Sequence, residues 1–151
     1  MKYKLLVLDI DGTVTNSKKE VTEKTKNAIL DLQKRGIPVA IASGRAPQGI
    51  YSVAKALELD KFGSYIMPFN GARIVNFQTG ECIYSKTLPL HLPARLWRDA
   101  VENGIGIVTY DEKEVIAGTK PDKYTLLEAK IASMPIAYHE DFSYLCGFSG
   151  K

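Results

Sequence analysis

The chain has 151 residues, of which 45% are hydrophobic and 25% are charged, and its formal net charge is +3. This length fits one domain or two small ones, and the composition is ordinary for a soluble globular protein. The basic residues form no cluster and no apolar run approaches the roughly 20 residues of a membrane span, so we expect neither nucleic-acid binding nor a membrane partner. With two cysteines and no signal-peptide pattern, we expect a cytoplasmic protein with reduced thiols.

Strand and helix signals alternate over the first 70 residues. Short apolar runs predict strands over Lys4–Ile10, Ile37–Ala42 and Tyr65–Pro68. Helical periodicity predicts helices over Lys19–Arg35, capped by Thr22, and over Pro47–Leu57. This β-α-β-α-β order predicts an α/β fold with a Rossmann-like parallel sheet and right-handed crossovers.

The pattern changes at Asn70-Gly71. Residues 72–76 and 82–86 read as a hairpin around Thr79-Gly80. The later signals predict helices over 92–103 and 123–132 and strands over 105–110, 114–117 and 136–138. This mixture indicates a small α+β module, so we divide the chain into residues 1–72 and 73–151.

Two acids follow the first predicted strand. Asp9 and Asp11 are two residues apart, and side chains at this spacing on an extended chain point to the same side. Ligands of open parallel sheets bind beyond the carboxyl ends of the strands. Two converging carboxylates repel each other unless a hard cation such as Mg²⁺ neutralises them, and Gly12 permits a sharp turn there. We therefore predict a metal site at Asp9 and Asp11.

The second predicted strand ends in Ser43-Gly44-Arg45. A hydroxyl and a free backbone N–H at a strand-to-helix junction suit a phosphate oxygen. Acids, a metal and phosphate donors together indicate phosphoryl transfer. In that chemistry Asp9 could attack phosphorus, while Asp11 could protonate the leaving oxygen and later activate water.

Structural explanations compete with this interpretation. An isolated Asp-x-Asp-Gly is often a solvated turn or a helix cap, and an isolated Ser-Gly is weaker still. The two motifs together, each closing an apolar strand of one β-α-β unit, favour a site. Arg45 fits a surface or supporting position, and Asn70 fits either a turn or a polar group that faces the site.

The quoted motifs resemble a known family. "LDIDGT" at 8–13, "IASGR" at 41–45 and "NGARI" at 70–74 resemble the motifs of the haloacid dehalogenase-like (HAD) superfamily, in its Cof-type sugar phosphatase subfamily. The resemblance implies a Mg²⁺-dependent phosphatase that acts on a small phosphorylated metabolite through an aspartyl-phosphate. It implies that Asp9 is the nucleophile and a metal ligand, and that Asp11 is the general acid/base and supplies a second metal ligand.

The resemblance also implies phosphate-binding and hinge positions. The amides around Ile10, the Ser43 hydroxyl and Gly44 would hold phosphate, and Asn70 and Gly71 would line the route to the cap. Residues 1–72 would be the first half of a HAD-like core, and residues 73–151 would be part of a cap domain.

Two later motifs of the family, a charge-balancing lysine beyond the cap and a Gly-Asp sequence, are not matched here, and Gly-Asp occurs nowhere. We therefore expect an N-terminal portion of such an enzyme, with little activity on its own. We also expect either a homodimer contact through the exposed edge of the first strand or poor solubility. The alternative function is a non-catalytic remnant that binds a phosphate ligand or a protein partner.

Overall fold

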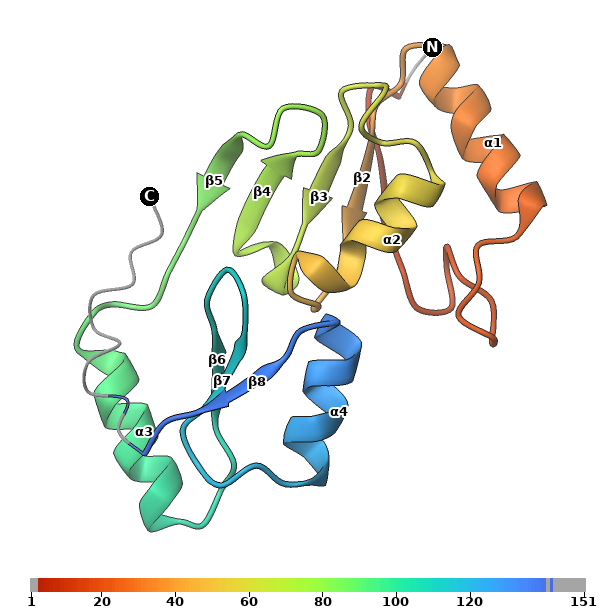
Figure 1. The fold of residues 1–151 in the computed structure, drawn as a ribbon. Coiled ribbons are helices and arrows are strands. Elements are labelled where there is room, and N and C mark those ends of the chain that lie inside the picture. Colours follow the sequence, from red (N-terminus) through yellow and green to blue (C-terminus); the bar gives the residue numbers. More distant parts are fainter. Residues whose placement is uncertain (1–2, 141, 143–151) are drawn as a thin grey trace. The chain divides into compact units, whose positions relative to one another are not determined.

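A computed structural model describes residues 3–140 and residue 142 (Figure 1). The chain divides into two compact units, Met1–Lys86 and Thr87–Lys151. The elements of the first unit are β1 (Leu6–Asp9), α1 (Glu23–Lys34), β2 (Val39–Ala42), α2 (Gln48–Ala56), β3 (Tyr65–Met67), the 3₁₀ turn η1 (Phe69–Gly71), β4 (Arg73–Asn76) and β5 (Cys82–Ser85).

The five strands of the first unit form one sheet in the order β1-β2-β3-β4-β5. β1 runs parallel to β2 with Leu6 opposite Val39, and β2 runs parallel to β3 with Ile41 opposite Ile66. The predicted α/β fold with a parallel sheet is therefore confirmed.

The β4–β5 hairpin extends this sheet in antiparallel orientation, with Tyr65 of β3 opposite Asn76 of β4. The sequence analysis assigned residues 73–86 to the second module. In the structure the backbone groups of β4 pair with β3, so the first compact unit continues to Lys86. The functional division into a core and a cap stays a prediction.

Helix α1 begins four residues later than the sequence predicts. The Thr22 side chain accepts a hydrogen bond from the Thr25 N–H (3.2 Å), as expected for its cap. The preceding residues instead close a tight turn, in which the Asn16 N–H donates to the Glu20 carbonyl (2.9 Å). That turn belongs to the loop after β1, and it places Lys19 outside the helix.

Both helices of the first unit pack against the sheet through one hydrophobic core. Two consecutive right-handed β-α-β crossovers place their helices on the same face of a sheet. The core includes Ile29 of α1 and, from α2 and the strands, Ile50, Val53, Ala54, Leu57, Val39, Ile41 and Ile66.

Strand β1 is only partly buried. Among the residues described, it pairs with β2 alone and forms the edge of the sheet. Leu6 and Leu8 pack against the core and line an apolar groove of about 340 Å³ beside α1. Leu5 and Val7, on the opposite face, are 47% and 48% exposed. The expectation of a buried strand is therefore wrong for that face, because both helices lie on the other one.

A buried polar network joins four elements of the first unit. The Ser64 hydroxyl donates to Gln33 Oε1 (2.7 Å) and accepts from the Val39 N–H (3.0 Å). Gln33 Nε2 donates to the Leu57 carbonyl (2.9 Å). Because these buried groups are paired, the network ties α1 and the end of α2 to the starts of β2 and β3.

The second unit has a three-stranded sheet in the order β6-β7-β8 (Figure 1). Its elements are α3 (Leu92–Glu102), β6 (Val108–Tyr110), β7 (Val115–Ala117), α4 (Lys123–Ala132) and β8 (Ile136–Tyr138). Trp97 of α3 donates its indole N–H to the Gly118 carbonyl (2.7 Å) and packs near Phe142. No helix among the residues described combines the length and apolarity that spanning a membrane requires.

Helix α4 starts with a capping box. The Asp122 carboxylate accepts hydrogen bonds from the N–H groups of Tyr124 (2.9 Å) and Thr125 (2.8 Å), and the Thr125 hydroxyl accepts from the Asp122 N–H. The bond from the Thr125 N–H, with further bonds from the same turn, lowers the pKa of Asp122 below its ordinary value of 3.8. The ionised carboxylate is therefore the form that caps this helix.

The buried network leads to the first prediction. Replacing Ser64 with alanine leaves the Val39 N–H and Gln33 Oε1 without partners, so we expect the first unit to lose about 1–3 kcal/mol of unfolding free energy. Hydrogen exchange of the β2 amides measures this loss. Ser52→Ala, on the exposed side of α2, is the control and should change stability by less than about 0.5 kcal/mol. Equal exchange rates in the two variants would contradict the proposed role of the network.

The capping box leads to a pH prediction for the second unit. A folded-state pKa below the unfolded value stabilises the fold above the unfolded value, and this contribution disappears as pH falls through the folded value. Asp122→Ala should therefore lower Tm near neutral pH, and the difference should shrink below pH 3.8. The fluorescence of Trp97, the single tryptophan, reports unfolding of this unit. Glu102→Ala is the control for removing an acid, and a difference that does not depend on pH would contradict the prediction.

Candidate active site

The predicted site residues lie where parallel strands of the first sheet end. Asp9 is the last residue of β1 and pairs in register with Ala42, the last residue of β2. Ser43 follows β2 directly, and its N–H donates to the carbonyl of Met67 at the end of β3 (3.1 Å). We use "candidate site" for residues 9–12, 43–45 and 70–71.

The chain turns sharply after Asp9. Ile10 is fully buried, and its carbonyl accepts hydrogen bonds from the N–H (3.0 Å) and the hydroxyl (2.9 Å) of Thr15. Gly12 has φ +80°, in the left-handed region that glycine enters without strain. The turn anchors its backbone beneath Ile10, while the side chains of Asp9 and Asp11 remain at the surface.

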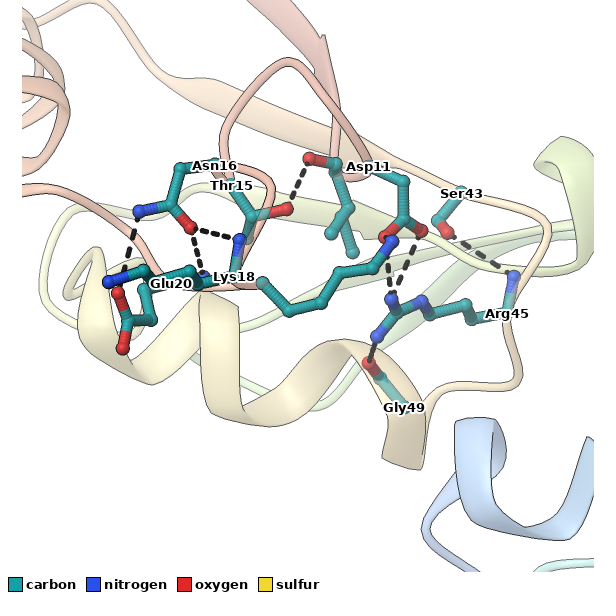
Figure 2. Close-up of polar contacts among 10 residues, drawn as sticks. Asp11, Thr15, Asn16, Lys18, Glu20, Ser43, Arg45 and Gly49 are labelled. Carbon is teal, nitrogen blue, oxygen red and sulfur yellow. Dashed lines mark hydrogen bonds and ion pairs between the residues drawn. The ribbon is translucent and has the colours of Figure 1, made fainter. Parts of the chain in front are cut away.

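The Asp11 carboxylate lies between two cations. Arg45 Nη2 is 2.8 Å from Asp11 Oδ1 and 3.0 Å from Oδ2, and Lys19 Nζ is 2.7 Å from Oδ1. Figure 2 shows the Arg45 guanidinium directed at this carboxylate from the turn that follows β2. The hydrogen bond from Lys19, with those from Arg45, holds the pKa of Asp11 below its ordinary value of 3.8, although partial burial acts in the opposite direction.

Ser43 and its neighbours form a compact turn. Ser43 is buried, and its hydroxyl oxygen accepts a hydrogen bond from the Arg45 N–H (3.3 Å). A Cβ on Gly44 would lie 3.1 Å from the side-chain oxygen of Asn70, so the two residues are in close contact. Glycine at position 44 therefore leaves room for the Asn70 side chain.

Asn70 combines the two readings that the sequence left open. It has left-handed backbone angles within η1 (φ 55°, ψ 35°), and its N–H donates to the Ser43 carbonyl (3.0 Å). Its side chain meanwhile lies against Gly44. Gly71 follows with φ +83°. The structure thus brings together positions 43, 44 and 70, while their roles toward a ligand stay predictions.

The structure defines two neighbours of Asp11 that sequence reasoning did not pair with it. Of the two positions predicted for Arg45, the supporting one is found, because Arg45 bonds both oxygens of Asp11 and has a side chain only 21% exposed. Lys19 was placed at the start of a helix, whereas the structure puts it in the loop after β1. The helix signal at Thr22 was correct, and counting α1 from that cap would have left Lys19 in the loop.

The oxygen donors of the site match a hard cation. Asp9 offers a carboxylate and Asp11 a carboxylate and a backbone carbonyl, and Mg²⁺ needs only one or two carboxylates because it keeps several waters. The residues described contain no cluster of three or more His, Cys, Asp and Glu side chains. The donors that are present therefore suit Mg²⁺ if water completes its coordination.

Comparison with known proteins identifies the family. The family model of haloacid dehalogenase-like hydrolases matches residues 6–144. The Streptococcus pyogenes protein named "Putative phosphatase M6_Spy0533" is 30% identical over 91% of this chain, and the Bacillus subtilis protein named "Putative phosphatase YkrA" is 34% identical over 93%. The match covers 52% and 51% of those proteins, so the chain spans about half the length of these curated relatives.

A solved structure agrees with this result. The crystal structure of a haloacid dehalogenase-like hydrolase from Bacteroides thetaiotaomicron superposes with a TM-score of 0.86 at 37% sequence identity. It covers 99% of this chain and 56% of the other. Since the family model matches most of the chain and the fold agrees, the chain belongs to the haloacid dehalogenase-like hydrolase family.

Proposed function

We propose that this chain carries the nucleophile and the phosphate-binding turn of a Mg²⁺-dependent phosphatase. The substrates would be small phosphate monoesters, such as sugar phosphates, and the reaction would pass through an aspartyl-phosphate. The observation that carries the proposal is the register of β1 and β2, in which Asp9 lies opposite Ala42 and directly beside the Ser43 turn. Membership of a hydrolase family whose relatives are named as phosphatases supports it.

The reaction would proceed in two displacements. An Asp9 carboxylate oxygen attacks phosphorus, and the bond between phosphorus and the leaving oxygen breaks as that oxygen takes a proton from Asp11. Asp11 then takes a proton from water, whose oxygen attacks phosphorus. Phosphate departs, and the Asp9 carboxylate is restored. Ser43 and the backbone N–H groups near Ile10 and Gly44 would hold the phosphoryl oxygens.

The charges around Asp11 bear on its proton transfers. Bonded to Lys19 and Arg45, Asp11 is held as a carboxylate, which suits the step that activates water. The first step requires a protonated Asp11. A phosphate dianion that draws the two cations toward itself would weaken their hold and raise the proton affinity of Asp11. Substrate binding would thus prepare the acid.

The metal would be held by the Asp9 carboxylate and the Asp11 backbone carbonyl. When bound, Mg²⁺ offsets the negative charge that the acid and the phosphate bring together. Because the chain spans about half the length of its curated relatives, the activity of the whole protein is part of this proposal. We expect the 151-residue chain alone to turn over slowly. The cytoplasmic location also stays a prediction.

Ligand binding tests the proposal without requiring turnover. Inorganic phosphate added with Mg²⁺ to the ¹⁵N-labelled chain should shift the amide signals of residues 9–12 and 43–44 together. Asp9→Asn removes a proposed metal ligand, so we expect the Mg²⁺-dependent part of phosphate affinity to fall by at least about tenfold. Losing a residue that merely supports a metal ligand already costs about tenfold or more in metal affinity.

Asp31→Asn is the matched control for that experiment, because Asp31 is an exposed aspartate of α1 and pairs with Arg35. It should leave the titration unchanged. Shifts confined to other parts of the chain, or equal Mg²⁺ dependence in Asp9→Asn, would refute the proposed site.

Turnover separates the phosphatase from the alternative of a non-catalytic remnant that binds a phosphate ligand or a protein partner. Slow Mg²⁺-dependent hydrolysis of an aryl phosphate, lost in Asp9→Asn, would establish catalysis by this chain. Robust hydrolysis that is lost in the same variant would also establish catalysis, but it would overturn our expectation of slow turnover. Phosphate binding without any hydrolysis is the result that the remnant requires.

We also propose that two copies of the chain associate through β1. Within the described part of the chain, one edge of the strand has no neighbouring strand to pair with its backbone groups, and half-exposed Leu5 and Val7 lie beside that edge. Pairing of two edges in antiparallel orientation would satisfy those groups and cover the apolar side chains of both copies.

Sedimentation velocity tests this association. The wild-type chain should sediment as a dimer at about 100 µM, and Val7→Lys should sediment as a monomer because a charge on an edge strand opposes pairing. Ile83→Lys, on the exposed edge strand β5, is the control and should remain dimeric. A wild-type monomer, or dissociation caused by Ile83→Lys alone, would rule out the β1 contact.

A further inference from the structure

Two cationic side chains from separate segments of the first unit bond the Asp11 carboxylate. Arg45 reaches it from the turn after β2, and Lys19 reaches it from the loop after β1. Arg45 is itself fixed, because its Nη1 donates to the Gly49 carbonyl of α2 (3.2 Å; Figure 2). Two positive charges therefore share one carboxylate, and each is positioned independently of the other.

Hydrogen bonds within the Gly12–Glu20 loop fix the position of Lys19. Asn16 Oδ1 accepts hydrogen bonds from the N–H groups of Lys18 (2.9 Å) and Glu20 (3.0 Å), as Figure 2 shows. The Lys19 N–H donates to the Asn16 carbonyl (2.9 Å). The buried Thr15 anchors the base of the loop to the Ile10 carbonyl. These bonds determine the backbone at position 19.

The backbone at Lys19 is unfavourable for a side chain. Its φ of 64° lies in the left-handed region, where glycine is the residue that enters without strain. Strain of this kind persists where surrounding structure over-determines it, as the Asn16 hydrogen bonds do here. Here the side chain bonds the carboxylate at the centre of the candidate site.

An ordinary surface ion pair is the competing explanation, since the Lys19 side chain is 66% exposed and such pairs contribute little to stability. That explanation accounts for the ion pair alone, and not for a loop whose hydrogen bonds hold Lys19 beside a carboxylate of the candidate site. The partner of Lys19 is also no isolated surface acid, because the mostly buried Arg45 side chain holds the same carboxylate.

We propose that Lys19 is a positioning residue that, together with Arg45, holds the Asp11 carboxylate in one orientation. The inference rests on the proposed function for the role of Asp11 as acid and base. The contacts of Lys19 and Arg45 with Asp11 are present in the ligand-free chain, so they can be tested without turnover.

The experiment separates positioning from structural support. Three-bond NMR couplings of Asp11 report its χ1 rotamer, and the wild-type chain should show a single rotamer. Lys19→Gly should give rotamer-averaged couplings, while Tm stays equal or rises by about 1–4 °C because glycine relieves the strained φ. A residue with only a structural role would instead lower Tm when replaced.

Two further variants complete the test. Lys19→Arg keeps a cationic donor and should retain the single rotamer. Lys18→Ala removes an exposed neighbouring charge and should also leave Asp11 in one rotamer. A single Asp11 rotamer in Lys19→Gly, or equal averaging in Lys18→Ala, would overturn the inference.

The outcome does not depend on phosphate binding. If the Asp11 rotamer responds to Lys19 while phosphate fails to bind near Asp9, the positioning inference stands and the proposed function fails. If phosphate binds as proposed while the Asp11 rotamer does not change in Lys19→Gly, the proposed function stands and the positioning inference fails.

Discussion

The parallel pairing of β1 with β2 is the constraint on which the candidate site depends. Its register aligns Asp9 with Ala42, so the chain leaves both strands at the same level. The loop after β1 and the turn after β2 then have to meet, and Arg45 bonds Asp11 across that junction. A slip of one residue would turn the Asp9 side chain to the opposite face of the sheet and separate these groups. The buried Ser64–Gln33 network fixes the start of β2.

The two faces of the first sheet differ in a way that follows from its connections. Helices α1 and α2 share one core, as two right-handed crossovers would place them, and Leu5 and Val7 remain about half-exposed. An apolar strand at an edge, half-exposed and beside an apolar groove, is a surface that native proteins normally cover. The chain also spans about half the length of its curated relatives. Among the residues described, the first unit thus combines a well-packed side, which positions the site, with a side that leaves Leu5 and Val7 half-exposed.

The two acids of the candidate site differ in their surroundings. Asp11 is tied to Lys19 and Arg45 and is kept ionised by them. Asp9 lies exposed at the end of β1, where its carboxylate is accessible to a cation or to phosphorus. An attacking carboxylate needs access, whereas an acid and base needs a controlled orientation and a proton affinity that can change. The arrangement of the two side chains agrees with these requirements.

The sequence by itself determined the parallel sheet, the cap at Thr22, the family motifs and the placement of Asp9 and Ser43 at strand ends. Apolar runs, capping residues and glycine turns act over a few neighbouring residues, so they can be recognised from the sequence alone. It misjudged Lys19, the half-exposed β1 and the membership of the β4–β5 hairpin in the first sheet, and it did not identify Asp11 as the partner of Arg45. Those features depend on which strand or side chain a residue meets 8 to 34 positions away or across a sheet edge, and only tertiary structure decides such pairings.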